Sequence, residues 1–190
     1  GDTIVFTYED DLWLVPAGGG DARRLTRDDG AERYAKFSPD GTMIAFTGTY
    51  DGGRDVYVVE ATGGVPRRLT WHPADDRVLD WTPDGAAVLF RSDRDVPYRA
   101  EELYTVALTG GMPRRLPVDR AGLASLSPDG RLLASANMDG EVELWDLSSG
   151  TLLTTLKGVS TPRSVSSSVM AALTASAVPT GTVLLSTTTL

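Results

Sequence analysis

A unit that recurs every 44 to 47 residues limits the folds that this chain can adopt. The tripeptide Pro-Asp-Gly begins at residues 39, 83 and 128, and Arg-Arg-Leu begins at residues 23, 67 and 114. Between these marks lie short runs of β-branched and aromatic residues, which favour strands, separated by Gly and Asp turns. A period of about 40–50 residues with four short strands per unit is typical of propeller blades. We therefore predict an all-β fold, a β-propeller of four-stranded antiparallel blades.

The repeat divides the chain into four blades and a tail. We place the blades at residues 1–30, 31–76, 77–120 and 121–158, and the first of them lacks its first strand. Three strands in the first unit and four in each of the next three make fifteen strands. We expect these four blades and a partial fifth one, in a ring that is either incomplete or of hybrid origin.

Recurrent residues within the blades have structural explanations. Pro presets φ, Asp can bond its own backbone and Gly accepts positive φ, so Pro-Asp-Gly should turn the chain between the first and second strands of a blade. The Gly-Gly pairs should join the third and fourth strands. An aromatic residue recurs in each third strand, where we expect it to fill the space between neighbouring sheets: Trp13, Tyr57, Tyr104 and Trp145.

The charge balance excludes some classes of partner. With 26 acidic and 18 basic residues the net charge is -8, whereas nucleic acid and anionic membranes attract clustered Lys and Arg. No Cys is present and no acidic pair has the spacing of a calcium loop, so we predict no metal and no cofactor. No apolar run is long enough to span a bilayer, and residues 1–4 lack the features of a signal peptide. We expect a cytoplasmic protein whose partners are proteins, peptides or further copies of itself.

The same motifs resemble those of two propeller families. Ser-Pro-Asp-Gly at residues 38–41 and Gly-Gly-Val-Pro-Arg-Arg-Leu-Thr at residues 63–70 are similar to blades of TolB-type propellers and of the tricorn protease. The tricorn likeness is the closer one; it covers about residues 1–130 and includes Asp-Asp-Leu-Trp-Leu-Val-Pro at residues 10–16. It implies a noncatalytic amino-terminal propeller that packs in a large peptidase assembly and guides or binds peptides, with the catalytic residues in later domains. We recognise none of those domains here and predict no enzyme activity.

Residues 121–158 resemble a WD-repeat blade instead. The dipeptide Trp145-Asp146 gives that family its name. Val159 stands where the family usually has the His that bonds to an Asp and to the strand Trp, so this hydrogen-bond network is incomplete. The change of pattern near Gly130 suggests an alternative for the whole chain, namely an engineered or recombinant hybrid propeller with no biochemical activity of its own.

Residues 159–190 fit neither pattern. Fourteen of these 32 residues are Ser or Thr, which is compatible with a disordered tail. Residues 165–173 and 182–189 are also β-prone enough for degenerate strands, and we favour at least partial strand structure. Because open sheet edges leave backbone groups unpaired, we predict that residues 182–189 complete the first blade beside residues 3–7 or form part of a fifth blade.

Candidates for catalysis are few. His72 is the only histidine, and it precedes Pro73 in an expected loop, so we interpret it as a surface residue rather than as part of a catalytic triad. The Arg-Arg pairs should lie on strands at the outer edges of blades, where charge discourages edge-to-edge association. An alternative role for them is to bind acidic peptide termini. Three acidic pairs are expected to be solvated turns: Asp10-Asp11, Asp28-Asp29 and Asp75-Asp76.

A binding site of the propeller should lie at the axial channel or at a channel mouth, where loops from every blade converge. Residues 93–99 form the longest insertion between a second and a third strand. We predict that Arg94, Tyr98 and Arg99 in this insertion contact the ligand. A plain surface loop is the alternative, and binding that survives replacement of all three residues by Ala would exclude the prediction.

Overall fold

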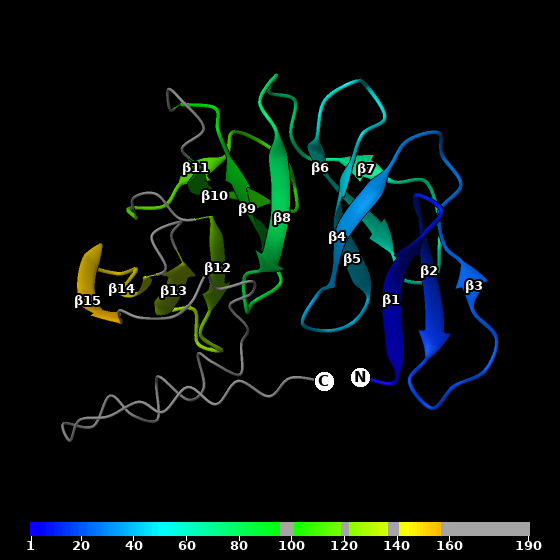
Figure 1. The fold of residues 1–190 in the computed structure, drawn as a ribbon, viewed down its shortest axis with the longest axis horizontal. Helices are drawn as coiled ribbons and strands as arrows, with labels where there is room; N and C mark the ends of the chain where they lie inside the picture. The colour runs from blue at the N-terminus through cyan, green and yellow to red at the C-terminus, as the bar shows by residue number, and fades with distance from the viewer. Residues whose placement is uncertain (96–100, 119–121, 137–140, 157–190) are drawn as a thin grey trace. The chain divides into compact units, whose positions relative to one another are not determined.

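The part of the chain that the structure describes folds into four antiparallel sheets (Figure 1). The computed structural model describes residues 1–95, 101–118, 122–136 and 141–156. The first sheet contains β1 (Thr3–Tyr8), β2 (Asp11–Pro16) and β3 (Arg23–Arg24), and the second contains β4 (Glu32–Phe37), β5 (Met43–Gly48), β6 (Asp55–Glu60) and β7 (Arg67–Arg68). The third contains β8 (Asp76–Trp81), β9 (Ala87–Ser92), β10 (Glu102–Ala107) and β11 (Arg114–Arg115), and the fourth contains β12 (Leu123–Leu126), β13 (Leu132–Ala136), β14 (Val142–Asp146) and β15 (Thr151–Leu156). The predicted all-β fold is confirmed, with three strands in the first blade and four in each of the others.

The sheets belong to two compact units that divide at residues 121 and 122. The first unit contains the first three sheets, and the fourth sheet belongs to the second unit. Within every sheet, strands that follow one another in sequence lie side by side. Each repeat of the sequence therefore folds into one blade by local pairing of consecutive strands.

The Pro-Asp-Gly turns have the geometry that their residues predict. In the second sheet, Gly41 has a φ of 74°, and the Asp40 Oδ1 accepts hydrogen bonds from the Thr42 amide at 3.0 Å and from the Ser38 hydroxyl at 2.6 Å. These bonds lower the pKa of the Asp40 carboxyl. The same contacts recur around Asp84 and Asp129. The recurrent Asp is therefore a turn-forming residue.

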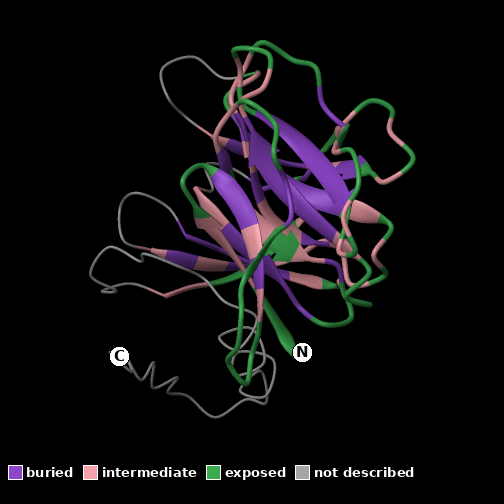
Figure 2. Ribbon diagram, turned by 90° about the vertical axis from the view of Figure 1, so that its right-hand side faces the viewer, coloured by how far each residue is buried: buried purple, intermediate pink, exposed green. Residues whose placement is uncertain are grey.

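Apolar side chains between neighbouring sheets form the core of the first unit. Figure 2 shows that the buried residues lie mainly on the strands. Leu12, Leu14 and Leu25 of the first blade pack with residues of the second: Ile44, Phe46, Tyr57 and Val59. A second cluster joins the second and third blades: Ala45, Val56, Val58, Leu69, Val78, Trp81, Val88, Phe90, Tyr104 and Val106. Tyr57 and Tyr104 are 4% and 2% exposed, as the recurrence of aromatic residues in the third strands predicted. Trp13 and Trp145 are half-buried.

The fourth sheet contains the WD-like dipeptide. The Trp145 ring N–H donates to the Ser135 hydroxyl oxygen at 3.2 Å. The Asp146 carboxylate closes the next turn by accepting hydrogen bonds from the Ser148 and Ser149 amides at 2.8 and 3.1 Å. Val159, the residue that replaces the expected His, lies outside the described residues. The structure thus assigns a local role to each member of the dipeptide.

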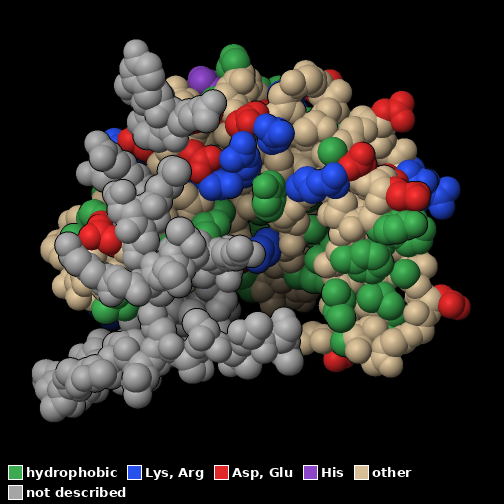
Figure 3. All heavy atoms as spheres, viewed as in Figure 1, with side chains coloured by type: hydrophobic (Ala, Val, Ile, Leu, Met, Phe, Trp, Pro, Cys, Tyr) green, Lys and Arg blue, Asp and Glu red, His purple; other side chains and the backbone are tan. Residues whose placement is uncertain are grey.

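Strand β1 lies at an edge of the first sheet, where β2 is its only neighbour among the described strands. The corresponding strand of the second sheet, β5, lies between β4 and β6. As a result β5 is almost wholly buried, whereas no residue of β1 is buried. Ile4 and Tyr8 are 50% and 56% exposed, and Figure 3 shows hydrophobic side chains gathered over this part of the first sheet.

Deletion of residues 159–190 is expected to lower the melting temperature and to promote self-association. The segment that we predict to cover β1, residues 182–189, lies outside the described residues, so closure of the first blade stays a prediction. If that segment pairs with β1, its removal uncovers backbone groups and apolar surface. Each kcal/mol lost should lower the melting temperature by about 2–4 °C for a chain of this size. Thermal unfolding and light scattering test this, and a monomeric variant with unchanged melting temperature would contradict it.

Candidate binding surfaces

The second Arg of each Arg-Arg pair forms an ion pair with an acid at the start of the third strand of the same blade. The distances are 2.5 Å for Arg24 and Asp11, 2.6 Å for Arg68 and Asp55, and 2.5 Å for Arg115 and Glu102. The pairs lie on outer-edge strands, as predicted. The ion pairs were not predicted, although the acid stands thirteen residues before the Arg in each blade. These arginines are therefore part of the blade structure.

A buried carboxylate, that of Glu32, joins the first two blades. Glu32 is 0% exposed, and its Oε2 accepts hydrogen bonds from the Leu12 amide at 2.9 Å and from the Thr26 hydroxyl, both of the first blade. Its Oε1 accepts from the Tyr50 hydroxyl of the second blade. Burial raises the pKa of the Glu32 carboxyl, and the three hydrogen bonds oppose that rise only in part. Sequence reasoning missed this residue, because nothing near it in the chain marks it as buried.

The corresponding residue of the third blade, Asp76, is also 0% exposed but has a different partner. Its Oδ2 lies 2.6 Å from Nη2 of Arg94. The prediction that acidic pairs are solvated is therefore wrong for Asp76, and equally for Asp11, which is 7% exposed. Both carboxylates lie at the first residue of a strand, where they face the neighbouring chain segments rather than water.

Arg94, one of the three predicted ligand-binding residues, packs against its own blade. Its guanidinium lies 5.2 and 5.0 Å from the ring centroids of Phe90 and Tyr104, and its side chain is 9% exposed. The other two predicted residues, Tyr98 and Arg99, lie outside the described residues. The structure therefore brings Arg94 together with Asp76, and the binding role of the insertion stays a prediction.

Basic and acidic side chains alternate on the surface beside this insertion. Asp75 pairs with Arg54 and, at 3.3 Å, with Arg77, while Glu101 lies 3.0 Å from Arg77 and 2.6 Å from Arg91. Figure 3 shows such side chains next to one another on the visible face. Because each of these arginines already faces a carboxylate, this surface does not form a basic patch.

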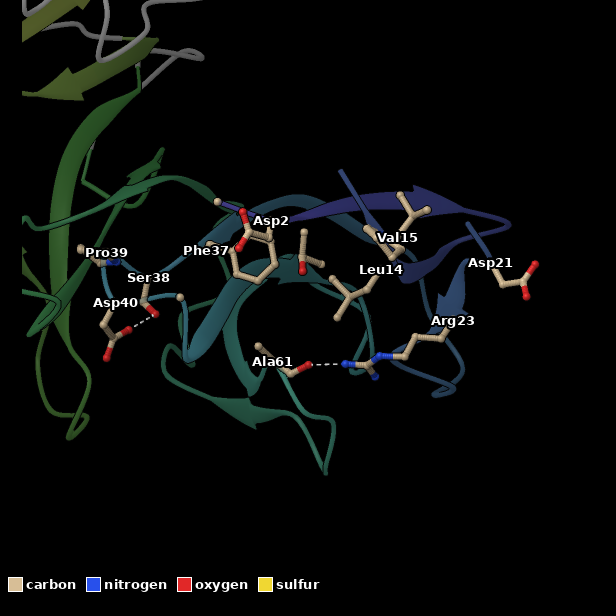
Figure 4. A pocket seen from close by; sticks show the side chains of 14 residues that line it. Asp2, Leu14, Val15, Asp21, Arg23, Phe37, Ser38, Pro39, Asp40 and Ala61 are labelled. Carbon is tan, nitrogen blue, oxygen red and sulfur yellow. Dashed lines mark hydrogen bonds between the residues drawn. The ribbon is translucent and has the colours of Figure 1, made fainter. Parts of the chain in front are cut away.

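A cavity of about 550 Å³ lies between the first and second blades (Figure 4). Leu14 of β2 and Phe37, the last residue of β4, point toward the middle of the view. Arg23 reaches across from β3, and its Nη2 donates a hydrogen bond to the Ala61 carbonyl at 2.5 Å. The volume is within the range of about 300–1,000 Å³ that is usual for small-ligand pockets.

Few groups suited to catalysis come together in the described residues. His72 is exposed, and its Nδ1 accepts a hydrogen bond from the Ala74 amide at 3.2 Å. Within the described ranges no three His, Asp or Glu side chains are arranged to hold a metal ion. A search of the same residues for a helix that could cross a bilayer found none.

The chain is similar to curated tricorn proteins of Streptomyces coelicolor. It is 46% identical over 52 residues to tricorn protease homolog 1 and 50% identical over 48 residues to a second tricorn protease homolog. These stretches are 27% and 25% of this chain but only 5% and 4% of the two relatives. The chain thus spans a small part of their length.

Solved structures with a similar fold include TolB proteins. The chain superimposes on TolB from Agrobacterium tumefaciens with a TM-score of 0.66 at 25% identity, over 82% of this chain and 61% of the other. For TolB from Acinetobacter baumannii the TM-score is 0.61 at 23% identity, over 85% and 43%. The tricorn protease N-terminal beta propeller domain matches residues 1–169, which include the WD-like stretch. The chain therefore belongs to the family of tricorn protease N-terminal β-propeller domains.

Proposed function

We propose that this protein is a noncatalytic propeller domain that guides or binds peptides or protein partners. The observation that carries the proposal is the match of residues 1–169 to the propeller domain of the tricorn protease. The cavity of about 550 Å³ between the first two blades supports it, because it offers a recess in which a ligand could be held. The same proposal places the protein in the cytoplasm and excludes nucleic acid and membranes as its partners.

The alternative, a hybrid propeller whose only property is to fold, predicts that the protein captures nothing. It derives from the change to WD-like residues near Gly130 and from Trp145-Asp146. Capture of specific peptides therefore distinguishes the two functions.

The full chain, immobilised and exposed to a tryptic digest of a purified protein, should retain a defined subset of peptides that mass spectrometry identifies. Fluorogenic peptides should not be hydrolysed by the same preparation. Retention of no peptide would favour the hybrid alternative. Turnover that survives repurification and disappears in the His72→Ala variant would overturn the noncatalytic assignment, because His72 is the only histidine.

A further inference from the structure

The cavity between the first and second blades has a counterpart between the second and third. We call these two spaces the first groove and the second groove. Each is bounded by the turn that follows the first strand of the later blade, at residues 38–41 in the first groove and 83–85 in the second. The first groove measures about 550 Å³ and the second about 390 Å³. The same position of the repeat is thus more open between the first pair of blades.

At two positions of the repeat the first groove has a smaller side chain than the second. In the second groove, Trp81 is 3% exposed, its ring N–H donates to the Lys36 carbonyl at 2.9 Å, and Leu108 packs against the core beside it. The first groove has Phe37 in the position of Trp81 and Ala61 in the position of Leu108. These smaller side chains fill less of the groove, so a side chain of a ligand can contact its apolar wall.

The walls of the first groove combine apolar side chains with carboxylates. Pro16 and Phe37 supply apolar surface, and Asp2, Asp21 and Asp40 supply carboxylates. The hydrogen bonds that Asp40 accepts from Thr42 and Ser38 lower the pKa of its carboxyl and keep it ionised. The one guanidinium among the lining residues, that of Arg23, is held by the Ala61 carbonyl. Figure 4 shows Asp2 next to Phe37 and Asp21 at the far side, beyond Arg23.

We propose that the first groove binds a peptide segment in which a bulky apolar side chain stands beside Lys or Arg. The apolar side chain enters the space that Trp81 and Leu108 fill in the second groove, where it is removed from water. The cationic neighbour faces the carboxylates at the rim, which makes the groove complementary in charge. This inference rests on the proposed function and assigns that function a site and a class of ligand.

The probe is the tripeptide acetyl-Lys-Leu-Lys-amide, titrated into the ¹⁵N-labelled full chain and followed by NMR. A ligand of this size should bind with a dissociation constant on the order of 1 mM. The amide signals of Leu14, Phe37 and Ala61 should shift. Peptides with Gly in place of Leu, or with Glu in place of both Lys, should bind at least about tenfold more weakly, a loss of about 1.4 kcal/mol.

Filling the first groove should abolish this binding. The Ala61→Leu variant has in the first groove the residue type that Leu108 supplies in the second. We expect the affinity of this variant for the probe to be at least about tenfold lower. Ala107→Leu is the matched control, because it makes the same change at an exposed strand end of the third blade and should leave affinity unchanged. The paired substitution Asp2→Asn with Asp21→Asn should weaken binding several-fold and reduce its dependence on salt.

The results separate this proposal from the broader one. If the peptides retained by the immobilised chain bind the Ala61→Leu variant with the same affinity as the natural protein, the groove assignment is overturned and the proposed function still stands. Retention of no peptide, together with no shift by the probe, would overturn both. Shifts that follow apolar content and charge, and that disappear in Ala61→Leu only, would establish the site.

Discussion

Replacement of Arg94 by Ala is expected to lower the free energy of unfolding by about 3–5 kcal/mol, the usual cost of removing one partner of a buried ion pair. The carboxylate left behind, that of Asp76, is 0% exposed, and Arg94 lies 2.6 Å from its Oδ2. Its Oδ1 has no hydrogen-bond partner within the described residues, so no second donor compensates for the loss. The variant also loses the contacts of the guanidinium with the rings of Phe90 and Tyr104. Chemical denaturation measures the difference.

Arg67→Ala is the matched control, because Arg67 is an exposed Arg in the second blade. It should change the unfolding free energy by no more than about 0.5 kcal/mol, as is usual for surface substitutions. Adding Asp76→Asn to Arg94→Ala should restore part of the stability, since the unpaired charge is then removed. Equal stabilities of the Arg94→Ala and Arg67→Ala variants would show that the ion pair contributes nothing.

The ion pair of Arg94 with Asp76 affects any test of the predicted binding site. Simultaneous replacement of Arg94, Tyr98 and Arg99 by Ala would destabilise the third blade, so a loss of binding would be ambiguous. The pair Tyr98→Ala and Arg99→Ala keeps the ion pair of Arg94 with Asp76 intact. If the double variant Tyr98→Ala with Arg99→Ala loses binding while Arg94 is intact, the ligand contact belongs to the insertion.

The fold could be predicted from the sequence because its signals are local. Pro-Asp-Gly encodes its own turn, with the Asp40 carboxylate accepting from the amide two residues later. Consecutive strands pair with one another, so the repeat period is enough to define a blade. Tyr57 and Tyr104 were predicted to be buried because their positions recur in the third strand of each unit.

The polar contacts could be predicted only in part because they join residues that are distant in sequence. The partner of Arg94 is eighteen residues away, and Leu12 is twenty residues from Glu32. The ion pairs of the second Arg in each pair did leave a signal, a constant separation of thirteen residues from an acid. No comparable pattern marked the first groove, since Phe37 and Ala61 stand out only when they are compared with the larger Trp81 and Leu108 of the next blade.

Replacement of Glu32 by Ala is also expected to lower the free energy of unfolding strongly. The Thr26 and Tyr50 hydroxyls would each lose a buried acceptor, whereas the Leu12 amide would keep the Thr26 oxygen at 2.9 Å. At about 1–3 kcal/mol for each unsatisfied group, the unfolding free energy should fall by about 2–6 kcal/mol. Glu60→Ala is the control, because Glu60 is exposed at the end of β6 and its carboxylate accepts a long hydrogen bond of 3.3 Å from the Thr62 hydroxyl. Equal losses in the two variants would show that Glu32 does not join the blades.

The pH dependence of stability separates the charge of Glu32 from its hydrogen bonds. Burial raises the pKa of this carboxyl in the folded protein above its ordinary value of 4.5. As pH rises past 4.5, the unfolded chain therefore releases its proton first, and the unfolding free energy falls until the folded-state pKa is passed. Glu32→Gln cannot titrate, so the stability of the natural protein relative to this variant should decline with rising pH across that window. Denaturation curves measured at several pH values test this. A relative stability that stays constant with pH would mean that Glu32 is ionised as readily in the folded protein as in the unfolded chain, and one that rises with pH would mean that it is ionised more readily.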